Sequence, residues 1–140
     1  LDEIYKTILQ TLAHFDLYDP AYHTATYLLL RSKGKLSAQS MHRDGVQKNE
    51  YDNKPWEEVG FTALLSLSHD TTLQIVASFD DETDLTNIQT IPIYNGELLV
   101  WRRDMWHGGG KHLSNAIDSY RLIVQTSPII ASCTTYLVRS

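Results

Sequence analysis

The sequence holds few of the features that mark a disulfide-stapled or membrane-spanning chain. Among its 140 residues only Cys133 is a cysteine, which excludes an internal disulfide and a cysteine zinc motif. No apolar run approaches the roughly 20 residues of a membrane-spanning helix, and no signal-peptide pattern opens the chain. We therefore expect an intracellular protein of the cytoplasm or nucleus, with no membrane partner. Because the chain begins at Leu1 rather than Met, we also expect it to be a piece of a longer protein.

Positive charge is also scarce. The chain has 12 Lys and Arg residues against 17 Asp and Glu residues, for a formal net charge of −5. This balance argues against an extended basic face for nucleic acid, although a small local one is compatible with it. A chain of this length can bury a real core without metal or disulfide staples, so we expect one domain over residues 1–140.

What the sequence does have is one amphipathic helix followed by many short strands. Ile4, Ile8, Leu12 and Phe15 recur near helical spacing, and Asp19-Pro20 stops the pattern. This predicts a helix over residues 2–14 that packs outside a sheet. Strand-like runs rich in threonine, tyrosine and branched apolar residues follow at 24–30, 36–41, 61–68, 72–79, 88–94, 98–101, 121–126, 129–130 and 135–138.

Turn signals between these runs predict a mainly β fold, a sandwich or barrel of jelly-roll type, with its core over about residues 24–138. Pro92 indicates an edge strand or a bulge. Asn95-Gly96 is the strongest hairpin signal in the chain.

Two histidines and an aspartate stand where such a roll can bring them together. His42 and Asp44 form an H-x-D, and side chains two apart on a strand share a face. His107 follows an apolar strand at an expected glycine turn. The residues between Asp44 and His107 suffice for about four strands, which can return the chain beside its start. His42, Asp44 and His107 would then form the two-histidine, one-carboxylate face that holds non-haem Fe(II).

Other polar and aromatic residues are candidates for ligand contacts. Arg121, on the next apolar strand, suits the carboxylate of an organic acid because its planar fork binds carboxylates in bidentate fashion. Tyr27 and Arg31 are secondary candidates beside that acid, and Gln39 is another polar residue near them. The polar loop 45–59 carries Tyr51 and Trp56, which either contact substrate or tuck onto the core of a plain connection.

Together these features resemble the Fe(II)- and 2-oxoglutarate-dependent oxygenases, over about residues 24–127. The resemblance rests on His42, Asp44, His107 and Arg121 in their order and strand context. It implies a double-stranded β-helix of the jelly-roll or cupin-like kind, with the triad binding Fe(II) and Arg121 binding the distal carboxylate of 2-oxoglutarate. It further implies that O2 is consumed, that 2-oxoglutarate becomes succinate, and that an unidentified small-molecule or macromolecular substrate is hydroxylated or oxidatively demethylated.

The chain departs from parts of this family's pattern. Some relatives have a serine two positions after the arginine, where this chain has Ile123. The subgroup that acts on alkylated nucleobases has an Asn-x-Tyr pair before its H-x-D, and the nearest residues here are Leu29 and Arg31. The departures leave the substrate class open.

A different class of function stays open as well. A cupin-like β-roll could bind a metal without 2-oxoglutarate, or serve only as an interaction module. We expect core packing for Trp101 and Trp106, and a turn at which Arg103 pairs with Asp104 while Arg102 is in solvent. The remaining histidines are expected to be structural or surface groups: His14, His23, His69 and His112.

Overall fold

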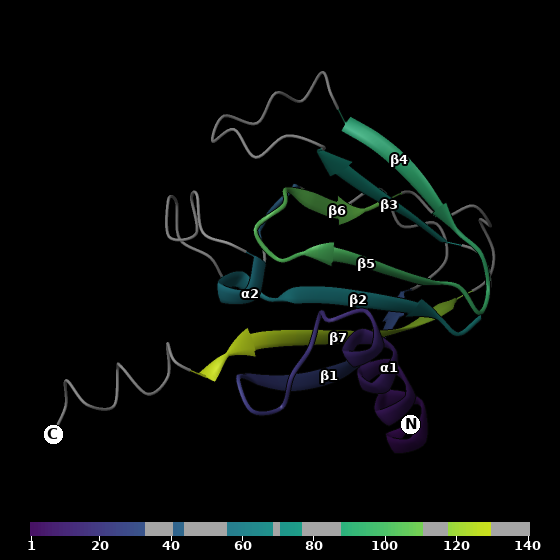
Figure 1. Ribbon diagram of the computed structural model, residues 1–140. Helices are drawn as coiled ribbons and strands as arrows, with labels where there is room; N and C mark the ends of the chain where they lie inside the picture. The colour runs from purple at the N-terminus through teal and green to yellow at the C-terminus, as the bar shows by residue number, and fades with distance from the viewer. Residues whose placement is uncertain (33–40, 44–55, 69–70, 77–87, 111–117, 130–140) are drawn as a thin grey trace, which may run out of the picture.

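The computed structural model describes residues 1–32, 41–43, 56–68, 71–76, 88–110 and 118–129. Over these ranges the chain is mainly β, with one N-terminal helix outside two antiparallel sheets (Figure 1). No helix in the described ranges is long and apolar enough to cross a membrane. The expected jelly-roll class is confirmed.

Helix α1 spans Asp2–His14, as the spacing of its apolar residues predicts. Its acidic first turn and basic last turn match the helix dipole. Ile8 and Leu12 are buried against Leu122 and Val124 of the sheet beneath. The helix therefore covers the outer face of that sheet, as expected.

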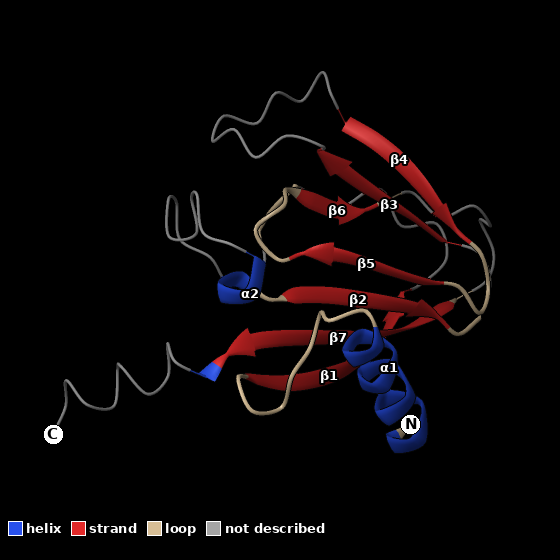
Figure 2. Cartoon of the chain, viewed as in Figure 1, coloured by secondary structure: helices blue, strands red, loops and turns tan. Residues whose placement is uncertain are grey.

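In the described part of the chain, seven strands build the two sheets, and Figure 2 distinguishes them from the helices by colour. The larger sheet has the order β1-β7-β2-β5 and the smaller one β4-β3-β6. Between His42 and His107 lie four described strands, as the sequence suggested. The strands are β1 (His23–Ser32), β2 (Phe61–Ser66), β3 (Thr71–Val76), β4 (Ile88–Ile93), β5 (Leu98–Arg102), β6 (His107–Gly109) and β7 (Ser119–Pro128).

Strand alternation divides the apolar residues between two cores. On β7, Leu122 and Val124 face α1, whereas Ile123 packs with Leu64, Leu73 and Trp101. The second group draws on β2 and β5 from the larger sheet and β3 from the smaller one, so it lies between the sheets. Side chains on β7 that share the parity of Ile123 consequently point between the sheets.

Three local expectations change in the folded chain. Asn95-Gly96 does form a turn, in which the Glu97 amide donates to the Tyr94 carbonyl, but it joins β4 to β5 in the other sheet and is no hairpin. His107, Gly108 and Gly109 form strand β6 in place of the expected glycine turn. Helix α2 (Trp56–Val59) occupies the end of the predicted loop 45–59. Pro92 lies on β4, at the edge of the described part of its sheet, as expected.

Candidate metal and carboxylate site

His42 and His107 lie directly opposite each other in an antiparallel bridge. The His42 amide donates to the His107 carbonyl at 2.8 Å, and the His107 amide donates to the His42 carbonyl at 2.9 Å. Directly opposed residues project their side chains from the same face of a sheet. The two imidazole rings accordingly lie with centroids 4.6 Å apart. The structure thus brings together two of the three expected metal ligands.

His107 is oriented by a backbone carbonyl. Its Nδ1 lies 2.8 Å from the Met105 oxygen. A carbonyl oxygen can only accept, so Nδ1 is the donor in this contact. Metal-binding histidines commonly donate their second ring N–H to a carbonyl in this way. The buried His107, with 4% of its surface exposed, is therefore held with its Nδ1 toward the Met105 carbonyl.

Both histidines line a pocket of about 360 Å³ between the two sheets. Trp101 of β5 forms part of its wall, with its ring centroid 5.1 Å from that of His107. Trp101 is buried, which agrees with the expected packing role. The lining also includes inward-facing residues of the larger sheet and one glycine of β6: Thr26, Leu28, Leu30, Thr62, Leu64, Arg121, Ile123, Gln125 and Gly109.

Arg121 supplies the positive charge of this pocket. It lies on β7 opposite Leu30 of β1 and Ser66 of β2, with the same parity as the inward-facing Ile123. Only 8% of its surface is exposed, and burial lowers the pKa of its guanidinium from the ordinary value. A cation held at such a site gains from an anionic ligand that replaces lost hydration.

The third expected ligand, Asp44, lies outside the described residues, as do Tyr51 and Gln39. Trp56 begins α2, but its side chain is likewise outside the description. Within the described ranges no group of three His, Cys, Asp or Glu side chains is gathered as a metal site. The expected triad is thus represented there by its two histidines.

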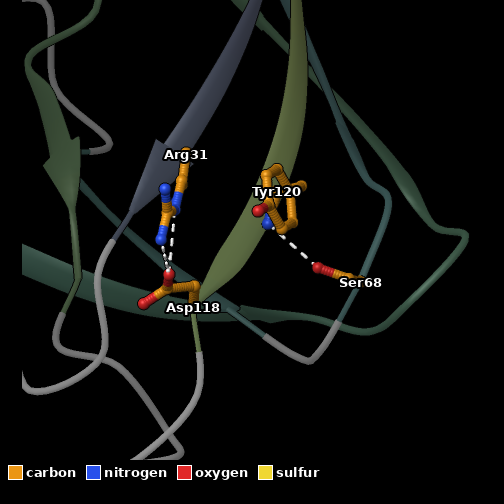
Figure 3. Close-up of polar contacts among 4 residues, drawn as sticks. All are labelled: Arg31, Ser68, Asp118 and Tyr120. Carbon is orange, nitrogen blue, oxygen red and sulfur yellow. Dashed lines mark hydrogen bonds and ion pairs between the residues drawn. The ribbon is translucent and has the colours of Figure 1, made fainter.

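Tyr27 and Arg31 are placed differently from Arg121. Tyr27 borders the pocket, but its hydroxyl donates to Asp2 at 2.7 Å and its ring lies 4.6 Å from Tyr5, both on α1. Arg31 pairs with Asp118 at 2.5 Å in an exposed position (Figure 3). Both side chains have the parity of the outer face of β1, opposite to that of Leu30. The structure therefore engages both in contacts away from the expected acid site.

Three polar residues of the pocket were missed from the sequence: Thr26, Thr62 and Gln125. Thr62 and Gln125 lie opposite each other on β2 and β7, and both line the pocket. The available signal was the parity of β7, since Gln125 lies four positions after Arg121 on the same face. Thr62 needed the pairing of β2 with β7, which the sequence does not reveal.

The turn before His107 also differs from its expected form. Arg102, not Arg103, pairs with Asp104, with Nε donating to Oδ1 at 2.7 Å. Arg103 instead donates to the Thr126 carbonyl at 3.3 Å and to the Ser127 hydroxyl. Arg102 ends β5 and Asp104 lies in the turn that follows, and the direction of this turn brings their side chains together. His14 is exposed and His23 is buried beside Asp19, so neither belongs to the site, as expected.

Several solved structures share this fold. ThoJ, a non-heme monooxygenase in complex with nickel, aligns with a TM-score of 0.60 at 15% identity, over 86% of this chain and 49% of that one. AviO1 from Streptomyces viridochromogenes aligns with a TM-score of 0.57 at 17% identity, over 86% and 56% of the two chains. EvdMO1 aligns with a TM-score of 0.55 at 17% identity, over 75% and 27%.

The present chain thus spans about half the length of ThoJ and AviO1. No family model matches the sequence, and no curated protein sequence matches it. At identities this low the likeness to the solved structures establishes the fold alone.

Proposed function

We propose that this chain is the core of a non-haem Fe(II)- and 2-oxoglutarate-dependent oxygenase. It would hydroxylate or oxidatively demethylate a substrate while 2-oxoglutarate is decarboxylated to succinate. One observation carries the proposal: His42 and His107 form a bridged pair on the wall of the pocket that also contains buried Arg121. A metal at the histidines and a carboxylate at the arginine would then share one pocket.

The histidines fit a metal of this kind. With Nδ1 donating to the Met105 carbonyl, Nε2 of His107 would be the nitrogen that binds the metal, and neutral imidazole suits iron. His42 supplies the second nitrogen, and Asp44 is proposed as the carboxylate. Iron bound there with 2-oxoglutarate supplies the oxidising chemistry toward O2. The similarity to ThoJ, a non-heme monooxygenase with nickel, supports such a metal at this fold.

Arg121 fits the far carboxylate of 2-oxoglutarate. The guanidinium can bind both carboxylate oxygens and so fix the orientation of the co-substrate. Its neighbours at the pocket wall, Leu30 and Ile123, are apolar and limit the water that competes for this contact. Charge-assisted hydrogen bonds are stronger where water is excluded, so the arginine would contribute both affinity and alignment.

The test is spectroscopic and needs no substrate. Fe(II) and then 2-oxoglutarate are added to the chain without oxygen, and the visible spectrum is recorded after each addition. A charge-transfer band that requires both is expected, because it arises when the co-substrate chelates the iron. Folded protein that binds the metal but develops no band would contradict the proposal and favour a cupin-like metal-binding module.

Two histidine variants make the test specific. His107→Ala removes one protein ligand and should abolish tight binding of Fe(II) together with the band. His14→Ala is the matched control, because His14 is an exposed residue at the end of α1. A band that survives His107→Ala undiminished would show that the metal lies elsewhere.

A further inference from the structure

The turn between β5 and β6 is held by a backbone hydrogen bond and by an ion pair. The Met105 amide donates to the Arg102 carbonyl at 3.0 Å and closes the turn. Inside it, Arg102 Nε donates to Asp104 Oδ1 at 2.7 Å, and only 6% of the Asp104 side chain is exposed. An aspartate is seldom buried to this degree unless it is paired. The ion pair with Arg102 therefore compensates for the burial of the Asp104 carboxylate.

The same turn is fastened to the larger sheet through Arg103. The Arg103 amide donates to the Gly60 carbonyl at 3.2 Å, and its guanidinium donates to Thr126 and Ser127 at the end of β7. Arg103, the residue before Asp104, is thus fixed to the larger sheet, and the hydrogen bond from the Met105 amide to Arg102 fixes the residue after it. As a result, the Met105 carbonyl has a defined direction.

That carbonyl is the group that accepts the Nδ1–H of His107. We propose that Asp104, through its ion pair with Arg102, is a positioning residue that sets the tautomer and ring orientation of His107. The inference rests on the proposed function in taking His107 as a metal ligand. Asp104 acts on the turn, the turn aims the Met105 carbonyl, and the carbonyl keeps the proton on Nδ1 and the lone pair on Nε2.

The direct test measures the tautomer in metal-free protein. Long-range proton–nitrogen NMR spectra of 15N-labelled protein at about pH 8.5, where histidine is neutral, distinguish Nδ1–H from Nε2–H. The His107 signals are assigned from their loss in His107→Gln. The wild-type ring should be protonated on Nδ1. Asp104→Ala should show a mixture of both tautomers, and Asp104→Asn, which keeps the side-chain volume and an acceptor oxygen, a smaller change.

Metal affinity provides the second readout. Calorimetric titration with Ni(II) should show binding that is about 10- to 100-fold weaker for Asp104→Ala, the usual effect of losing an outer partner of a metal ligand. Asp118→Asn is the matched control, because it weakens the Arg31–Asp118 pair away from His107. A merely structural role would lower thermal stability and leave the tautomer unchanged.

The inference is overturned by either of two results. One is a wild-type His107 protonated on Nε2. The other is an Asp104→Asn or Asp104→Ala protein that is folded and keeps both the Nδ1–H tautomer and the wild-type Ni(II) affinity. Because the NMR experiment uses metal-free protein, it decides the role of Asp104 even if 2-oxoglutarate fails to produce its band.

Discussion

The Arg43 guanidinium lies over the indole of Trp106, with its central carbon 5.3 Å from the ring centroid. These two residues are the neighbours of His42 and His107, and alternation places them on the other face of the same bridge. The histidines and the cation–π pair therefore secure opposite faces of one short contact between segments far apart in the sequence.

Replacing Trp106 should loosen this contact and weaken metal binding. A cation–π pair contributes about 0.5 to 2 kcal/mol, so Trp106→Leu should weaken Ni(II) binding by roughly 2- to 30-fold through a less fixed His42. Calorimetry measures the affinity, and Arg43→Met tests the same pair from its other member. Tyr94→Leu serves as control, because Tyr94 is an exposed aromatic residue at the β4–β5 turn. Unchanged affinity in folded Trp106→Leu would mean that the bridge holds His42 unaided.

Arg121→Met should weaken the binding of 2-oxoglutarate. Burial lowers the pKa of Arg121, which means that its surroundings disfavour the charged guanidinium. Methionine has similar length and no charge, so it keeps the apolar packing of the stem and removes the guanidinium, and urea unfolding shows whether the variant stays folded. The affinity of Ni(II)-loaded protein for 2-oxoglutarate should fall by about 1.5 to 3 kcal/mol, the contribution of hydrogen bonds to charged groups.

Urea unfolding and calorimetry measure these two effects. The matched ligand is 2-oxobutyrate, which has the chelating end of 2-oxoglutarate and lacks the distal carboxylate. It should bind wild type and Arg121→Met equally. Equal losses for both ligands would show that Arg121 supports the metal end of the pocket and not the far carboxylate.

The sequence predicted those features that local pattern determines. The apolar spacing of α1 and the alternation of the strands gave the elements, and the count of strands between His42 and His107 correctly implied that they meet. The Asn95-Gly96 turn was predicted correctly, but the pairing of the strands on either side of it was wrong. A turn signal does not encode which sheet the chain enters next.

Side-chain direction was the main property that the sequence left undetermined. Tyr27 and Arg31 have the parity opposite to that of Leu30, and a bulge in β1 would have reversed this assignment. The ten-residue ladder with β7 fixes the register, and this pairing is non-local. The Arg102–Asp104 pair was missed for the same reason. Which of two adjacent arginines contacts Asp104 depends on the direction of the turn, which the sequence does not specify.

Tyr27→Phe tests the observed direction of Tyr27. The hydrogen bond to Asp2, followed by the charge of that carboxylate, raises the pKa of Tyr27 above its ordinary 10.0. A raised folded-state pKa favours the folded chain below pH 10, and this contribution disappears as the pH rises through the folded value. Stability measured from pH 9 to 12 should therefore decline less in Tyr27→Phe than in wild type.

Co-substrate binding gives the complementary result for the same variant. Tyr27→Phe should bind 2-oxoglutarate as wild type does, because the hydroxyl is engaged by α1. Tyr22→Phe is the control, since Tyr22 is 61% exposed. A selective loss of 2-oxoglutarate affinity in Tyr27→Phe would restore the acid-site role expected from the sequence.

Gly110→Ala should destabilise the end of β6 through one identifiable contact. A Cβ at position 110 would lie 1.9 Å from Thr72 Oγ1 and 2.8 Å from Thr72 Cβ, and the Gly110 amide already donates to the Thr72 carbonyl. Overpacking of this kind costs about 1 to 3 kcal/mol. Because β6 also carries His107, the Ni(II) affinity should fall with the stability.

A double-mutant cycle with Thr72→Ala identifies the clash. Removing the Thr72 hydroxyl should recover part of the loss in Gly110→Ala, so the two substitutions should be coupled. Gly96→Ala is the contrast, because Gly96 has a φ of +86° and open space around its Cβ position. It should lose stability from backbone strain alone, keep its Ni(II) affinity and add independently to Thr72→Ala. If the losses of stability in Gly110→Ala and Thr72→Ala were also additive, β6 would be able to shift away from Thr72. The close approach of Gly110 to Thr72 would then have no part in placing His107.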